Sequence, residues 1–137
     1  MENWRDELSE AVKSKTEREA EDEARKKKRL AEALEVADEG LALALQGLQF
    51  SDELLQTKGQ QASLQEQDGR HVLALSDLSV AVELSRDDAI LKVSFNDARP
   101  REFDFCNDRH IAPRDVEEYV GRRIIELARA AQKAKPW

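Results

Sequence analysis

The sequence predicts an α+β protein: a long N-terminal helix, a small antiparallel meander of three or four strands, and a C-terminal amphipathic helix. Three observations predict it. The first 64 residues contain no proline and carry an apolar repeat of helical spacing. Residues 78–95 alternate apolar and polar side chains, which is typical of half-buried strands. Residues 113–134 return to helical spacing. We therefore expect two domains, residues 1–64 as a coiled-coil-like helical segment and residues 65–137 as a small α+β head.

An apolar stripe with steps of three and four residues runs through the second half of the long helix. Its members are Leu30, Leu34, Ala37, Leu41, Ala44, Leu48 and Leu55. This spacing forms a heptad repeat, which packs one helix against another. We therefore expect these residues to form an oligomer interface, most simply in a homodimer. Whether the helices pair in parallel, and whether the partner is a second copy, stays open.

The first half of the long helix is mostly charged. Trp4, Leu8 and Ala11 begin a second apolar stripe, and Asn3 suits the N-cap position. Beyond them, Glu21 precedes Arg25 by four residues. Pairs with the acid first stabilise a helix by roughly 0.2–0.5 kcal/mol each. The basic run at residues 25–29 is either a contact for an anionic partner or one turn neutralised by these acids, and we favour the second interpretation.

The length of this helix needs an explanation. A helix over residues 4–64 would be about 90 Å long at ~1.5 Å per residue, too long for a domain of this size to bury. It either pairs with another chain or folds back into a helical hairpin near Gly47 and Ser51. We favour an unbroken helix, because a glycine costs only about 1 kcal/mol in a helix interior.

The head is predicted from alternation and turn residues. Strands are expected at about residues 71–75, 78–84, 89–95 and 101–106. The glutamine-rich segment 60–69, which ends in Asp68-Gly69, is interpreted as a helix end and a linker. The helix at about residues 113–134 starts at Pro113, which suits a first helical position. Its apolar face should cover one side of the sheet.

Composition narrows the function classes. Charged residues make up 37% of the chain and aromatic residues 5%, and the net charge is −7. This profile favours a helix-rich interaction protein over an enzyme with a large core. The single cysteine excludes an intrachain disulfide. No apolar run of about 18 residues is present. We therefore expect no membrane association and a cytoplasmic protein.

Residues able to do chemistry are few. The nitrogen and sulfur ligands are Cys106, His71 and His110, too few for a structural zinc site. Asp97, Glu102, Asp104 and Asp108 cluster near one end of the predicted sheet. Acidic clusters can hold Mg²⁺, but an alternating strand also places acids on its solvent face. We favour that second interpretation and predict no catalytic residue, no metal and no cofactor.

A second basic group is expected around the sheet end and the last helix. It comprises Arg99, Arg101, Arg109, Arg114, Arg122 and Arg123. We interpret these arginines as a candidate partner surface. Trp4 and Trp137, at the two ends of the chain, are interpreted as interface residues, although for Trp137 disorder explains its position equally well.

Three hypotheses of function follow. The favoured one is a non-enzymatic scaffold or adaptor that oligomerises through its N-terminal helix and binds a protein partner through its head. The alternative is a nucleic-acid-associated accessory protein that uses the arginine surface. The third, a small cysteine or metal-dependent enzyme, requires Cys106 or the Asp104 cluster to converge in a pocket.

Overall fold

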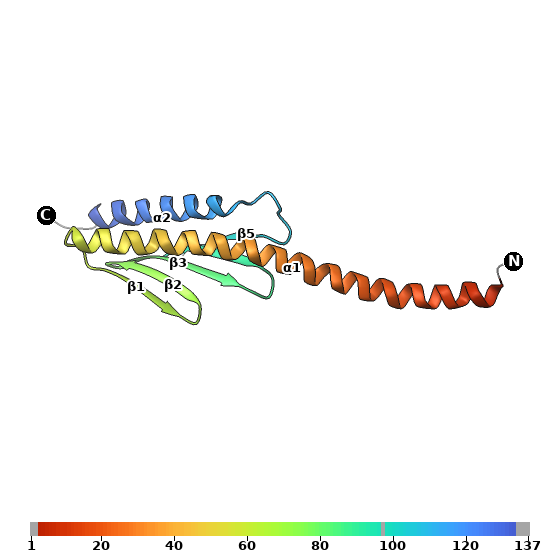
Figure 1. The fold of residues 1–137 in the computed structure, drawn as a ribbon. Helices are drawn as coiled ribbons and strands as arrows, with labels where there is room; N and C mark the ends of the chain where they lie inside the picture. Colours follow the sequence, from red (N-terminus) through yellow and green to blue (C-terminus); the bar gives the residue numbers. More distant parts are fainter. Residues whose placement is uncertain (1–2, 97, 134–137) are drawn as a thin grey trace.

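A computed structural model describes residues 3–96 and 98–133, except for the side chains of residues 13–15. The elements are helix α1 (Trp4–Thr57), strands β1 (Ala62–Gln67), β2 (Arg70–Leu75), β3 (Leu78–Ser85), β4 (Ile90–Phe95) and β5 (Arg101–Asp104), and helix α2 (Pro113–Lys133). The second half of α1 and all of α2 lie on one face of the sheet, and the first half of α1 extends beyond it (Figure 1). The α+β prediction is confirmed.

The sheet is a five-stranded antiparallel meander with the order β1-β2-β3-β4-β5. The prediction of three or four strands is too low, because residues 62–67 form β1 instead of a linker. Gln67 pairs with Arg70 across the two-residue turn Asp68-Gly69. Both turn residues have positive φ, 52° and 80°, which aspartate and glycine tolerate and tight hairpins require.

The turn between β2 and β3 is also a two-residue hairpin turn. Leu75 pairs with Leu78 across Ser76-Asp77. The inward side chains of neighbouring strands then meet on one face. Leu73 pairs with Val80, and both are fully buried.

The core lies between the sheet and the two helices. Helix α2 buries one face, formed by Val116, Val120, Ile124, Leu127 and Ala131. Helix α1 contributes mostly small residues, Ala33, Ala37, Gly40, Ala44 and Leu48. These small residues let α1 approach α2 closely. A β-carbon added at Gly40 would lie 3.3 Å from Cγ2 of Val116.

One ion pair joins α1 to the sheet. The guanidinium of Arg86, in the β3–β4 turn, donates two hydrogen bonds to the carboxylate of Asp38, at 2.8 and 3.2 Å. These hydrogen bonds and the charge of Asp38 raise the pKa of Arg86. Both side chains keep much of their surface exposed, so the pair links α1 to this turn at the surface of the molecule.

Helix α1 is continuous over 54 residues, so the alternative of a helical hairpin is wrong. Ser51 does not begin a second helix. Its hydroxyl instead donates a 2.7 Å hydrogen bond to the carbonyl of Gly47 within the same helix. The helix ends at Thr57, where Gly59 with φ of 81° turns the chain into β1.

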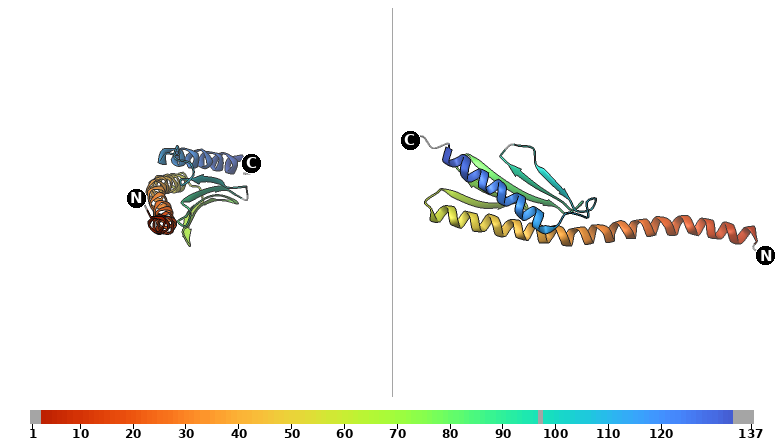
Figure 2. Two further views of the ribbon diagram at one scale, coloured as in Figure 1. Left: turned by 90° about the vertical axis from the view of Figure 1, so that its right-hand side faces the viewer. Right: turned by 90° about the horizontal axis from the view of Figure 1, so that it is seen from above.

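We call residues 4–29 of α1 the stalk. Every described side chain of the stalk is exposed, and no other element of the described chain lies beside it in Figure 1 or in the right view of Figure 2. Glu21 and Arg25 form an ion pair of 3.7 Å. Asn3 occupies the N-cap position as expected, but its side chain makes no capping hydrogen bond.

Candidate functional site

The predicted oligomer interface lies in and against the protein's own core. Ala37, Ala44 and Leu48 are fully buried. Leu30, Leu34, Leu41 and Leu55 are partly buried and pack against the same core. Contacts with the sheet and α2 therefore occupy this stripe, and the domain range 1–64 shares one core with the range 65–137. Association of chains stays a prediction, and it requires other positions on α1.

Such positions exist on the stalk. Trp4, Leu8 and Val12 are 66%, 55% and 61% exposed. They follow one another at four-residue spacing, so they lie along one side of the helix. Large apolar side chains on an isolated helix gain nothing from the chain that carries them. A row of three exposed apolar side chains is therefore a candidate contact surface.

A second apolar surface lies on the same helix, where α1 runs beside α2. Leu43, Gly47, Phe50 and Leu54 of α1 face Gly121, Ile125 and Ala128 of α2 across a groove of about 380 Å³. Phe50 is 66% exposed and Ile125 50%. A separate, smaller hollow of about 190 Å³ lies nearer the stalk, between Arg29, Glu32 and Val36 of α1 and the β5–α2 loop. We call the two together the helix groove.

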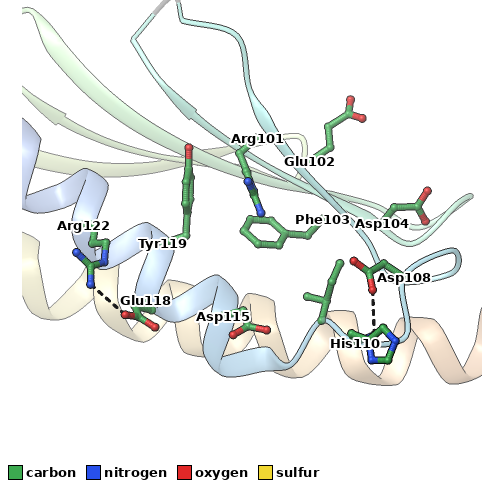
Figure 3. A pocket seen from close by; sticks show the side chains of 11 residues that line it. Arg101, Glu102, Phe103, Asp104, Asp108, His110, Asp115, Glu118, Tyr119 and Arg122 are labelled. Carbon is green, nitrogen blue, oxygen red and sulfur yellow. Dashed lines mark hydrogen bonds and ion pairs between the residues drawn. The ribbon is translucent and has the colours of Figure 1, made fainter.

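The largest groove of the head lies between β5 and the first half of α2 (Figure 3). We call it the head groove; its volume is about 510 Å³. Its aromatic wall is formed by Phe103 and Tyr119, whose rings meet edge to face at 5.7 Å. The guanidinium of Arg101 lies over both rings, at 5.1 and 5.6 Å from their centres. Arg123 lies 4.9 Å from the centre of the Tyr119 ring.

Carboxylates outnumber arginines in the head groove. Its lining holds Glu102, Asp104, Asp108, Asp115 and Glu118 against Arg101 and Arg122. Several of these acids also shape the β5–α2 loop. Asp104 accepts hydrogen bonds from Asn107, and Asp108 accepts one from the backbone of His110. The groove therefore offers an excess of negative charge, whereas the rings of Phe103 and Tyr119 already lie against the chain's own Arg101 and Arg123.

The six arginines predicted as one surface are divided. Arg101 and Arg122 line the head groove, and Arg109 lines the helix groove. Arg122 and Arg123 form ion pairs of 3.2 Å with Glu118 and 2.9 Å with Glu126. Arg99 lies in the β4–β5 connection, and Arg114 lies in the first turn of α2. Because the six arginines lie at separate places and Arg122 and Arg123 are paired with carboxylates, they do not form one continuous surface for a polyanion.

The head groove brings Glu102, Asp104 and Asp108 together with His110, but Cys106 lies apart from it. Cys106 lines the helix groove and His110 the head groove. Burial, and then the charge of Asp104, raises the pKa of the Cys106 thiol, which disfavours the nucleophilic thiolate. Within residues 3–96 and 98–133, no three acidic, histidine or cysteine side chains are grouped to hold a metal ion. Asp97, which the sequence placed in an acidic cluster, lies outside the described residues.

Sequence reasoning missed the helix groove. Leu43, Phe50 and Leu54 fall outside the predicted stripe, because two apolar stripes overlap in the segment LALALQGLQF. The second stripe has the same heptad spacing, and its phase differs from that of the first. Searching each helix for more than one apolar stripe would have found it.

No known protein family matches the chain, and neither the curated proteins nor the solved structures contain a significant match. The described helices include none that is long and apolar enough to cross a membrane.

Proposed function

We propose that this protein is a non-enzymatic interaction protein that associates through the stalk and binds a protein partner through its head. One observation carries the proposal. The chain continues α1 for 26 residues beyond its own core, from Trp4 to Arg29, and places large exposed apolar residues on that extension. An isolated helix of this kind is stabilised chiefly by packing against another helix.

The head groove supports the second part of the proposal. Its acidic rim suits a basic segment of another protein, because five carboxylates and only two arginines line the groove. The nucleic-acid alternative has less support, since carboxylates neutralise Arg122 and Arg123.

Light scattering tests the association directly. We expect the full chain to have twice the mass of one chain, and we expect Trp4→Asp with Leu8→Asp to reduce it to the mass of one chain. Each aspartate would place a charge in an apolar contact, which is strongly unfavourable. A monomeric mass for the unmodified chain at every concentration would contradict the proposal.

The matched control adds the same charge elsewhere on the stalk. Ser9 and Thr16 are exposed and seven residues apart, so they share one side of the helix, away from Trp4. Ser9→Asp with Thr16→Asp should leave the dimer intact. Circular dichroism should show the helix content of the unmodified chain for the control, and for Trp4→Asp with Leu8→Asp a loss confined to the stalk, which has lost its packing partner.

A further inference from the structure

We propose that two copies associate as an antiparallel pair of α1 helices, in which the stalk of each copy lies in the helix groove of the other. This inference rests on the proposed association and adds its direction, its register and its binding surface. Within residues 3–96 and 98–133, no other element covers the stalk or the helix groove. Both lie on α1, so a two-fold axis beside that helix and perpendicular to it brings the stalk of each copy to the helix groove of the other.

The spacing of the exposed residues along α1 supports this pairing. A second heptad pattern begins at Trp4, Leu8 and Ala11 and returns at Val36, Leu43 and Phe50. Between its apolar ends, the same spacing passes through Arg18, Asp22, Arg25, Arg29 and Glu32. We call these eleven positions the outer stripe. None of them is buried in the single chain, so the whole stripe is available to a second helix.

Charge selects the antiparallel direction. The stalk holds an acidic block at residues 17–23, with five acids and one arginine, followed by five consecutive basic residues at 25–29. A parallel pair would place each block against its own copy, and like charges would repel. An antiparallel pair centred between the blocks places the acidic block of each copy against the basic block of the other.

The same register of the antiparallel pair also sets its apolar contacts. When Asp22 faces Arg25 of the second copy, Ala11 faces Val36 and Trp4 faces Leu43. Trp4 then reaches the wider part of the helix groove, where Gly47 leaves open space for an indole ring. One unfavourable contact, Arg18 with Arg29, remains and occurs twice in the symmetric dimer. Moving the register by one heptad toward the heads sets Asp22 against Glu32 and Arg25 against Arg29, which is worse. Moving it by one heptad the other way sets Asp22 against Arg18 but places Glu32 against Leu8 and moves Trp4 from Leu43 to Val36.

The pairing also explains why Val36 and Leu43 keep exposed surface. Both face grooves at the side of α1, and a second helix would cover them. The two helices would overlap for about 60 Å, from Trp4 to Leu43, at ~1.5 Å per residue. The two heads would lie at opposite ends of the overlap.

Site-specific cross-linking tests the register on the full chain. In a Cys106→Ser background, Ala11→Cys together with Val36→Cys should cross-link two chains with a short bis-maleimide. Ala11→Cys alone should not, because the two copies of residue 11 would lie about 38 Å apart along the helices. In a parallel pair, Ala11→Cys alone would cross-link.

Charge exchange provides an independent measurement. Asp22→Arg should raise the dissociation constant of the dimer about tenfold, since it turns two attractive pairs into repulsive ones. Adding Arg25→Asp should restore it. A parallel pair would not respond to Asp22→Arg in this way, because Asp22 would face its own copy before and after the change.

Each outcome decides one point. A full chain of single mass overturns both the proposed function and this inference. A dimer that cross-links through Ala11→Cys alone, or through neither variant, overturns the inference and leaves the proposed association standing. Cross-linking only in the double variant, with recovery on charge exchange, supports the inference.

Discussion

Gly40 and Gly47 lie on the same helix and should respond in opposite ways to a larger side chain. A β-carbon at Gly40 would lie 3.3 Å from Cγ2 of Val116 and 3.6 Å from Cζ of Phe105, whereas Gly47 has no neighbour within 4 Å of that position. Carbon atoms prefer a separation of about 3.5–4.0 Å. The first added carbon at Gly40 is therefore already too close, and Val116 is fully buried and has no free space to move into.

The magnitudes follow from this contact. Replacing either glycine by a good helix former gains about 1 kcal/mol, so Gly47→Ala should raise the free energy of unfolding by that amount. Gly40→Leu gains nearly the same helix preference but adds three further carbons to a filled space. Overpacking costs about 1–3 kcal/mol and sometimes more. We expect a net loss of about 2 kcal/mol for Gly40→Leu.

Urea denaturation measures both changes. With a slope of about 2 kcal/mol per molar urea, the midpoint should fall by about 1 M for Gly40→Leu and rise by about 0.5 M for Gly47→Ala. Both variants belong in the Trp4→Asp, Leu8→Asp background, so that association contributes nothing. An unchanged midpoint for Gly40→Leu would refute the close packing of α1 against α2.

Three further predictions use other parts of the molecule. In a Trp137→Phe background, the fluorescence emission of Trp4, which is 66% exposed in one chain, should shift to shorter wavelength as the protein concentration rises. Leu43→Asp should abolish this shift. Emission that does not change with concentration would contradict the docking of Trp4. Cys106 should react with iodoacetamide more slowly than free cysteine near pH 9.0, the ordinary thiol value, because its pKa is raised and less thiolate is present; an equal rate would show that the thiol is not shielded. Asp115 accepts a 2.8 Å hydrogen bond from the backbone N–H of Ala112 at the start of α2. Asp115→Ala should therefore lower the free energy of unfolding by about 1 kcal/mol, measured by thermal unfolding. The control Glu117→Ala, at an exposed position, should change it little.

The sequence predicted the elements whose side chains alternate strongly. Val80 and Val82 predicted β3, and Val116, Val120 and Ile124 predicted the buried face of α2. Strand β1 was missed because its outward side chains are serine and glutamine, and its inward side chains are only Ala62, Leu64 and Glu66. Such a strand is specified mainly by its hairpin with β2, which depends on Asp68-Gly69 and on backbone pairing.

The apolar stripe of α1 shows why the surface that a helix packs against could not be predicted from the sequence. Heptad spacing specifies that a helix packs against an apolar surface, and it does not specify which surface. Ala37 and Ala44 meet the sheet and α2 of their own chain, because a five-stranded sheet needs more cover than one helix provides. The head groove was equally hidden, since Arg101 and Tyr119 are distant in sequence and meet only through the β4–β5 and α2 contacts.

The continuity of α1 has a mechanical consequence. No glycine or proline lies between Trp4 and Glu39, so the helix has no hinge where it leaves the core. A rigid rod of about 50 Å connects Trp4 to Ala37 at ~1.5 Å per residue. The packing around Ala37 therefore fixes the direction in which the tip points. A sideways force on Trp4 is therefore transmitted along the stalk to the place where α1 enters the core, near the contact between Gly40 and Val116.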